Sequence, residues 1–407
     1  PLWTQEQGNG KPENPVGWPL QNAPEASYAP AGVWHSSAGY SAVVTHDAYS
    51  AVQLGEAPSL RSIGANPGFV LVRGDTPQRR LTAITAYTGR PTMPPDWVFA
   101  PWNDAVGGPE RLEHVADTLR DADIPSSAIW AEDWIGGSQT ATGYRLSYAW
   151  AWSPEQYPEL NESIATLHRR GFAFLAYFNP FVPNTVAMWD EGIAGDFLVK
   201  RADGTVRTVI DAAFRTAGLV DLTHPPAVAW LEGYMRAAAA ELGIDGWMCD
   251  FSEWYPLDGV PRDGTSAWET HNLYPLAFQR ANRAALEAVR GRNWTFFARA
   301  GWASIHGGMG GIAPVHWGGD QNTDWLADDG FPTVVPIAVH LGLSGVTMFG
   351  SDIAGYNSFN KPNTTKELFY RWAMFGAFSP VMRTHHGSDE CGNWAFDRDA
   401  ETLAHYA

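Results

Sequence analysis

Trp247-Met-Cys-Asp-Phe-Ser-Glu253 is an apolar run that ends in two carboxylates three positions apart. The apolar half is typical of a short buried strand, and Asp250 and Glu253 follow where such a strand would end. A second stretch, Val315-His-Trp-Gly-Gly-Asp-Gln-Asn322, repeats the arrangement, with glycines that let backbone approach a ligand beside Asp320. Two strand-end aspartates so far apart in sequence require a fold that brings strand ends together.

The hydrophobic pattern of the sequence after residue 90 indicates such a fold, because short apolar runs alternate with longer helical patterns. Strands are expected at Trp97–Trp102, Ser127–Ala131, Ala173–Phe178, Gly246–Phe251, Thr295–Arg299, Pro314–Trp317, Val346–Ser351 and Pro380–Thr384. Helices are expected between them, at Pro109–Asp121, Pro154–Arg170, Pro225–Leu242 and Thr270–Val289. This alternation predicts an α/β fold, a (β/α)8 TIM barrel over residues 91–407. A doubly wound sheet is the alternative, but no glycine-rich phosphate-binding turn follows the first strand.

Residues 1–90 have a different composition, rich in Gly, Pro, Ser and Asn. Short alternating pieces such as Tyr40–Thr45 and Gly68–Arg73 predict part of an N-terminal β-sandwich. The first residues are neither a start methionine nor a signal peptide, and the last ones stop within a helical pattern. We therefore expect a piece of a longer protein, with a location that stays open and the cytoplasm favoured.

Composition restricts the partners of the protein. The 407 residues carry 44 acidic and 27 basic side chains, a net charge of -17, which repels nucleic acid and anionic membrane surfaces. No apolar run approaches the roughly 20 residues that cross a bilayer. Twenty tryptophans, several beside acidic residues, suit the apolar faces and polar rims of sugar rings. The predicted partner is a carbohydrate, with neither nucleic acid nor membrane, and a homo-oligomer is left open.

Polar residues collect at the carboxyl ends of the expected strands, which form the active face of such a barrel. They are Glu132, Asp133, Asn179, Asp250, Glu253, Arg299, Asp320, Asp352, Arg383 and His385. Cleavage of a glycosidic bond with retention needs a carboxylate nucleophile and a second carboxyl that acts as acid and then as base. Asp250, which follows an apolar strand, is the expected nucleophile, and Asp320 is the expected acid and base.

Metal chemistry is the alternative mechanism at this face, because His316, Asp320, Asp352, His385 and His386 could cluster. The signal is weak, since the chain has no His-Glu-x-x-His motif and no paired Cys and His spacing. We therefore expect neither a metal nor a cofactor.

At these residues the chain resembles glycoside hydrolase family 31, the retaining α-glycosidases with a β-sandwich ahead of a (β/α)8 barrel. The family's Trp-x-Asp-x-x-Glu motif is similar to Trp247–Glu253 with one extra residue before the aspartate, and Trp-x-Gly-Asp is similar to Trp317-Gly-Gly-Asp320. The resemblance implies that further residues hold substrate hydroxyls, brace the catalytic pair or shape the sugar pocket. These are Glu132, Asp133, Trp247, Glu253, Arg299, Trp317, Asp352, Arg383 and His385.

Within the family the chain looks most like the bacterial sulfoquinovosidase-like branch. Members of that branch bind the sulfonate of the substrate with an arginine, a tryptophan three residues later and a tyrosine after strand seven. Arg145 and Tyr356 match, but Tyr148 replaces the tryptophan. That branch also has Gln-Asp-Trp after strand two, where this chain has Glu132-Asp133-Trp134. A carboxylate accepts hydrogen bonds from hydroxyls and repels a sulfonate, so the expected substrate is a glucose-configured α-glycoside.

The resemblance thus implies an exo-acting, retaining α-glycosidase. It also implies C-terminal β domains, which are expected to be missing from this chain. Three alternatives stay open: a sulfoquinovosidase, an α-transglycosylase in which a sugar replaces water, and a carbohydrate-binding barrel that has lost its chemistry.

Overall fold

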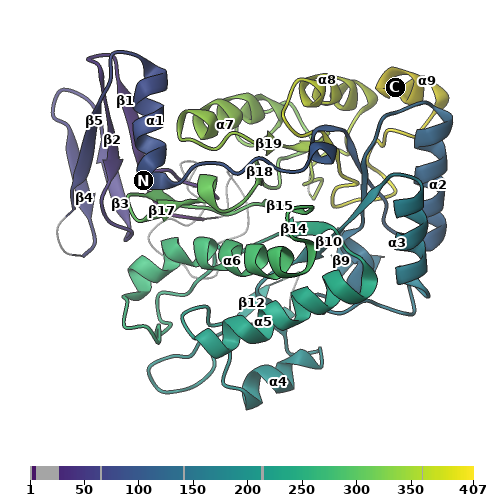
Figure 1. Ribbon diagram of the computed structural model, residues 1–407, viewed down its shortest axis with the longest axis horizontal. Coiled ribbons are helices and arrows are strands. Elements are labelled where there is room, and N and C mark those ends of the chain that lie inside the picture. The colour runs from purple at the N-terminus through teal and green to yellow at the C-terminus, as the bar shows by residue number, and fades with distance from the viewer. Residues whose placement is uncertain (1, 6–26, 65–66, 141–142, 212–214, 360) are drawn as a thin grey trace.

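Two parts of unequal size make up the computed structural model of the protein, which describes residues 2–5, 27–64, 67–140, 143–211, 215–359 and 361–407 (Figure 1). The smaller part holds an antiparallel sheet of β1 (Val33–Ser36), β2 (Tyr40–Val44) and β5 (Phe69–Arg73), and a hairpin of β3 (Ser50–Gln53) and β4 (Ser59–Ser62). The predicted strands at Tyr40–Thr45 and Gly68–Arg73 are confirmed.

A helix that the sequence analysis did not predict, α1 (Pro77–Thr88), lies against this sheet (Figure 1). It begins where Thr76 accepts a hydrogen bond from the Arg79 amide, with Pro77 in its first turn, which is a common helix start. Ile84 packs with Val43 and Val72 in a small separate core.

Parallel strands form the centre of the larger part. Along the sheet they are β19 (Phe349–Gly350), β18 (Val315–Trp317), β15 (Thr295–Ala298), β14 (Gly246–Cys249), β10 (Ala173–Phe178), β7 (Ala128–Trp130), β6 (Trp102–Asp104), β21 (Arg383–Thr384) and β20 (Asp352–Ile353). The first and last of these are two pieces of one run, divided at Ser351, and each pairs with a different neighbour. The sheet therefore closes on itself, and the predicted TIM barrel is confirmed.

Helices cover the outside of this barrel (Figure 1). They are α2 (Pro109–Asp121), α3 (Leu160–Arg169), α5 (Pro225–Ala237) continued by η3 (Ala238–Leu242), α6 (Ala267–Arg290), α7 (Phe331–Leu343) and α8 (Lys366–Ala377), with α9 (Ala400–Tyr406) beside α8. The helix predicted at Pro109–Asp121 is confirmed at both ends, and α6 begins with a capping box between Ser266 and Glu269. None of the helices in the described ranges is long and apolar enough to span a bilayer.

Several predicted boundaries were wrong. The strand predicted at Gly246–Phe251 ends at Cys249, the one at Val346–Ser351 covers only Phe349–Gly350 before the break, and the one at Pro380–Thr384 begins at Arg383. Two further errors lie beside prolines. The first strand was expected at Trp97–Trp102, but η1 (Asp96–Phe99) is a 3-10 turn and the strand begins only at Trp102. The helix expected from Pro154 begins at Leu160, because Pro158 interrupts the pattern and Glu159 has a left-handed backbone with φ 78°. In both places a proline next to the run ended the regular structure.

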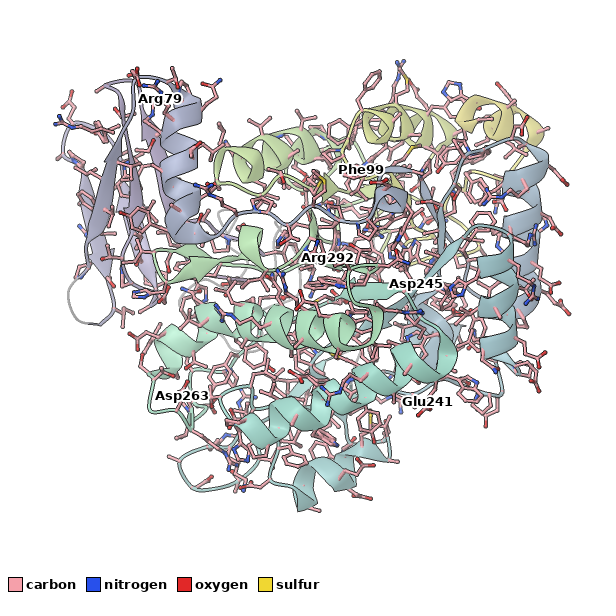
Figure 2. The ribbon with its side chains drawn as sticks, viewed as in Figure 1. Arg79, Phe99, Glu241, Asp245, Asp263 and Arg292 are labelled. Carbon is pink, nitrogen blue, oxygen red and sulfur yellow. The ribbon has the colours of Figure 1, made fainter. Side chains whose placement is uncertain are left out.

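Several barrel strands are followed, at their carboxyl ends, by segments that leave the barrel before the chain continues; these segments are called excursions. They are η2 (Glu132–Ile135) with the hairpin β8 (Gly137–Thr140) and β9 (Gly143–Leu146), a small sheet of β11 (Phe181–Pro183), β13 (Arg215–Leu219) and β12 (Thr208–Asp211) with α4 (Met188–Ala194), and the short pair β16 (Ala303–Ser304) and β17 (Gly307–Gly308) with η4 (Met309–Gly311). Side chains fill the space between the barrel strands and the helices (Figure 2). The excursions are the part of the chain that can differ between barrels of the same design.

Candidate active site

A cavity of about 170 Å³ opens at the carboxyl ends of the barrel strands. Its walls carry carboxylates, tyrosines and one arginine beside apolar groups, the composition of a sugar site. The lining residues are Glu132, Tyr144, Leu146, Tyr148, Tyr177, Met248, Asp250, Phe251, Trp254, Arg299, Asp320, Tyr356 and His385. Seven residues of this list were predicted from the sequence as site residues, and they come from six different strand ends.

Arg299, directly after β15, links the two predicted catalytic acids. Its Nη1 atom lies 3.2 Å from Oδ1 of Asp250 and 3.3 Å from Oδ2 of Asp320, while Nη2 donates to Oε1 of Glu253 over 2.6 Å. The rings of Tyr28 and Phe251 lie 4.9 Å and 4.1 Å from the guanidinium carbon. The same nitrogen, Nη1, contacts Oδ1 of Asp250 and Oδ2 of Asp320. These two oxygens can therefore be no further apart than their two distances from Nη1 added together.

Asp250 lies at the end of β14 and is buried except for 7% of its surface. The Tyr177 hydroxyl donates to Oδ2 over 2.7 Å and the Phe251 amide donates to Oδ1 over 2.8 Å. Burial is the largest influence on this carboxyl and raises its pKa to about 6, with Arg299 lowering it and Asp320 raising it. The carboxylate is therefore held by three donors in a poorly solvated place.

The turn after Asp250 has an uncommon backbone. Phe251 and Ser252 are consecutive residues other than glycine with positive φ, 55° and 86°. Each such residue costs of the order of 1–3 kcal/mol and tends to occur at functional sites. The conformation places the Phe251 amide on the carboxylate of Asp250 and the Phe251 ring over Arg299, so the strained turn fixes the nucleophile candidate.

Asp320 follows β18 through Gly318 and Gly319, and its side chain keeps 22% of its surface exposed. Gly319 has φ +86°, and a Cβ atom there would meet the Tyr28 ring at 2.2 Å. Only glycine satisfies both conditions. The N-terminal segment thus supports the loop that carries Asp320, a contact that the sequence did not indicate.

Asp352 and Arg383 form a buried ion pair on β20 and β21, and each is 1% exposed. Burial raises the pKa of Asp352 to about 7, although Arg383 lowers it. The Arg383 guanidinium also lies 4.5 Å from the Phe297 ring and 5.1 Å from the Trp130 ring. Neither Asp352 nor Arg383 lines the cavity in this structure, and the pair braces the strand that precedes Tyr356.

Glu132, at the start of η2, lines the cavity and faces two histidines. Its Oε1 atom lies 3.2 Å from Nε2 of His386, and its Oε2 atom lies 3.8 Å from Nε2 of His385. Burial, then the charges of His386 and Arg383, lower the pKa of His385 far below its ordinary value, so His385 is neutral at this wall. Together Glu132 and His385 offer an acceptor and a donor to a ligand.

Asp133, predicted beside Glu132 as a substrate-binding residue, points away from the cavity. Its carboxylate accepts hydrogen bonds from the Tyr144 hydroxyl over 2.6 Å, from the Tyr157 hydroxyl and from the Gly107 amide over 2.8 Å. The side chain is 0% exposed. It anchors the excursion after β7 through hydrogen bonds.

The residues predicted to bind an anion, Arg145, Tyr148 and Tyr356, lie on two sides of one wall. On β9, Tyr144 lines the 170 Å³ cavity, Arg145 lines a neighbouring cavity of about 640 Å³ instead, and Leu146 lines both. Tyr148 lines both cavities, and Tyr356 lines the first. Tyr148 and Tyr356 therefore share the first cavity, whereas Arg145 shares only the second cavity, with Tyr148.

The two predicted tryptophans, Trp247 and Trp317, are buried in the barrel and do not line the cavity. The Trp247 indole donates to Oδ1 of Asn282 over 2.5 Å, and the Trp317 ring packs on Phe297 at 5.4 Å. Glu253 is likewise buried, and it forms an ion pair with Arg299. These three residues support the strands that carry the lining groups.

Several residues at or behind the wall were not among the predicted glycosidase site residues: Tyr28, Tyr144, Leu146, Tyr177, Met248, Phe251, Trp254 and His386, of which His386 was considered only as a metal ligand. Tyr177 is the next-to-last residue of the confirmed strand Ala173–Phe178, so its place at the active end could have been inferred. Tyr28 and Tyr144 gave no signal, because their positions depend on how long excursions fold. Among the described residues, no group of three or more His, Cys, Asp or Glu side chains is arranged to hold a metal ion.

Comparison with known proteins supports the expectation drawn from the motifs. Residues 91–407 match the family model of the glycosyl hydrolases family 31 TIM-barrel domain. The chain is 36% identical to a sulfoquinovosidase of Escherichia coli, over 100% of this chain and 61% of that protein, and 26% identical to an alpha-xylosidase of Emericella nidulans, over 93% and 47%. A solved sulfoquinovosidase of the same family from E. rectale, in complex with an aza-sugar inhibitor, superposes with a TM-score of 0.84 at 31% identity, covering 93% of this chain and 57% of that one.

The chain thus spans about six tenths of the length of the sulfoquinovosidase relatives it matches. The family model covers the whole barrel, including every cavity-lining residue named above. The chain belongs to glycosyl hydrolase family 31, and its barrel is the TIM-barrel domain of that family.

Proposed function

We propose that the protein is a retaining, exo-acting α-glycosidase that releases a glucose-configured sugar by double displacement. The observation that carries the proposal is the bridging of Asp250 and Asp320 by one nitrogen of Arg299. Retaining enzymes place the two carboxyl groups roughly 5 to 5.5 Å apart, and inverting ones roughly 6.5 to 9.5 Å. A shared contact of this kind supports the shorter separation.

Asp250 is assigned the nucleophile. Its carboxylate attacks the anomeric carbon while Asp320 gives a proton to the leaving oxygen, which breaks the glycosidic bond and forms a glycosyl ester on Asp250. Asp320 then takes a proton from water, the hydroxide adds to the anomeric carbon, and the ester bond breaks. Two inversions return the sugar in its starting configuration.

The surroundings of the two acids favour this division of roles. Asp250 receives hydrogen bonds from Tyr177 and Phe251, which hold its carboxylate in place for attack. Asp320 is the more exposed of the two, with 22% of its side chain accessible, so a leaving oxygen and later a water can reach it. A proton donor and acceptor needs that access, whereas a nucleophile needs orientation.

A neutral sugar suits the charge of the cavity. Glu132, Asp250 and Asp320 line it, and Arg299, the one lining cation among the described residues, already contacts carboxylates. Arg145 faces the neighbouring cavity. A sulfonate placed here would meet three carboxylates, while hydroxyls can donate to each of them.

A sulfoquinovoside is the second candidate, because relatives at 36% and 32% identity carry the name sulfoquinovosidase. Rotation of Arg145 across the wall formed by Leu146 and Tyr148 would bring its charge toward Tyr356. The test is to compare kcat/KM of the full-length protein on an aryl α-glucoside and on the matching aryl α-sulfoquinovoside. Preference for the glucoside supports the proposal, and preference for the sulfonated sugar assigns Arg145, Tyr148 and Tyr356 to an anion site. Transfer of the sugar to an added sugar acceptor in place of water would identify a transglycosylase.

The pH dependence of kcat/KM should show an acid limb near pH 6. The raised pKa of Asp250, about 6, means that the carboxylate gains a proton as pH falls through this value and can no longer attack. Replacing Tyr177 by phenylalanine removes a hydrogen bond that lowers this pKa. Since a hydrogen bond to a charged group contributes about 1.5–3 kcal/mol, the limb should move to higher pH by about one to two units.

A full pH profile of both proteins measures this shift. Asp352, whose pKa is raised to about 7, pairs with Arg383 and receives no hydrogen bond from Tyr177. An acid limb that stays in place in Tyr177→Phe would therefore assign it to a group other than Asp250.

A further inference from the structure

A buried histidine that the proposed mechanism does not use lies behind Glu132. His386 keeps 5% of its side chain exposed, with Nε2 lying 3.2 Å from Oε1 of Glu132 and Nδ1 lying 3.4 Å from Oδ2 of Asp104. These contacts are ion pairs, and a protonated ring has an N–H toward each carboxylate, whereas a neutral imidazole has only one N–H. Burial lowers the pKa of His386, but Asp104 and Glu132 raise it to about 10, so the ring is a cation held between two carboxylates.

The three residues stand on adjacent strands of the barrel. Asp104 ends β6, Glu132 follows β7 and His386 follows β21, and β6 pairs with both neighbours. Asp104 is fixed in turn, because the Thr384 hydroxyl donates to its Oδ1 atom over 2.6 Å. The Tyr144 ring closes the other side, 5.3 Å from the His386 ring. His386 therefore has little freedom, and it fixes one oxygen of Glu132.

The other oxygen of Glu132 faces His385 across a gap. Nδ1 of His385 accepts a hydrogen bond from the Gly387 amide over 3.0 Å, so the hydrogen of the neutral ring is on Nε2. Nε2 lies 3.8 Å from Oε2 of Glu132, which is beyond hydrogen-bond range. Both side chains line the cavity. A hydroxyl between them can accept from His385 and donate to Glu132.

We propose that His386 is a positioning residue that determines specificity: it holds Glu132 so that Oε2, together with Nε2 of His385, binds one hydroxyl of the sugar. This inference rests on the proposed α-glycosidase function. A site built to pair with a hydroxyl rejects an analogue without it, because its buried polar groups are then left unpaired. His386 acts through Glu132 and does not touch the sugar.

The experiment uses the full-length protein and the aryl α-glycoside that the wild type prefers, with its series of monodeoxy analogues. In the wild type, one analogue should lose about tenfold or more in kcat/KM relative to the parent. In His386→Phe the parent should lose a similar factor and that analogue should lose little, so the ratio between them falls toward one. His386→Gln, which can still donate to Glu132, should restore part of the ratio.

His168→Phe is the matched control. Nε2 of His168 lies 2.7 Å from Oδ2 of Asp245, which precedes β14 and so lies at the end of that strand opposite to Asp250 (Asp245 is labelled in Figure 2). This control removes a histidine–aspartate pair and should leave the ratio unchanged. Equal loss for parent and analogue in His386→Phe would make His386 a merely structural residue and overturn the inference. If His386→Phe does not fold, His386→Ala, which also lacks a donor to Glu132, takes its place, and an unchanged ratio in that variant would overturn the inference.

Failure of the proposed function would look different. If the wild type hydrolyses no α-glycoside, calorimetry of the free sugar and its deoxy analogues tests the inference alone. A His386→Phe protein that still discriminates them by the wild-type factor in affinity would contradict it, and a loss of that discrimination would support it.

Discussion

Replacing Asp250 by alanine should lower kcat/KM by a factor on the order of 10⁴ or more. The variant loses the atom that bonds to the anomeric carbon, and the neighbouring groups cannot replace it. Tyr177 and the Phe251 amide only donate hydrogen bonds to the carboxylate, and Glu253 is fixed on Arg299. Steady-state kinetics with an aryl α-glycoside measures the loss.

Asp258→Ala is the control for this variant. Asp258 lies eight positions further along the segment between β14 and α6, on the surface, where it contacts Arg201 and Arg207. Its removal takes away a carboxylate without affecting the cavity, and activity should stay near that of the wild type. Near-normal turnover by Asp250→Ala, with a melting temperature close to the wild-type value, would show that Asp250 is not the nucleophile.

The second large effect is expected for Asp320→Ala and should depend on the leaving group. General acid catalysis contributes typically 10²–10⁴-fold. An alkyl α-glycoside, whose leaving oxygen needs a proton, should lose rate in this range. An aryl α-glycoside with an acidic phenol needs less help to leave, so formation of the glycosyl ester should lose much less and its hydrolysis should become the slow step.

Azide provides a check on the role of Asp320. It attacks the glycosyl ester without needing a base, so adding it should accelerate Asp320→Ala on the acidic aryl substrate. Asp328→Ala, which removes a surface carboxylate 3.8 Å from Lys361, should not respond. Equal losses on alkyl and aryl substrates, together with no effect of azide, would rule out Asp320 as the acid and base.

The sequence predicted the barrel and its active face well, because both depend on local patterns. The strand Ala173–Phe178 and the helix Pro109–Asp121 were found at their observed limits. Parallel strands in a closed sheet expose their carboxyl ends on one face, so polar residues after separate strands had to converge. Asp250, Arg299 and Asp320 were placed together on this basis.

The directions of individual side chains could not be predicted in the same way. Glu132 and Asp133 are neighbours in sequence, yet one lines the cavity and the other is tied to Tyr144 and Tyr157. Arg145 points to the opposite side of the wall from Tyr144. These orientations depend on how the excursion after β7 folds and on residues that reach it from elsewhere in the chain.

Contacts between distant segments explain the remaining omissions. Tyr28 packs on the loop of Asp320 and over Arg299 from a part of the chain expected to form strands only. His386 was considered only as a metal ligand, and its position between Asp104 and Glu132 depends on three strands meeting. A sequence gives residue types and periods, but not which long-range contacts form.

The configuration of the first-formed product tests the central claim most directly. NMR spectra taken within minutes of adding the full-length protein to an aryl α-glycoside distinguish the two anomers before they interconvert. Double displacement through Asp250 and Asp320 predicts that the α anomer of the free sugar appears first and the β anomer grows later. If the β anomer appears first, the bond is cleaved with inversion, and the assignment of Asp250 as a covalent nucleophile is wrong.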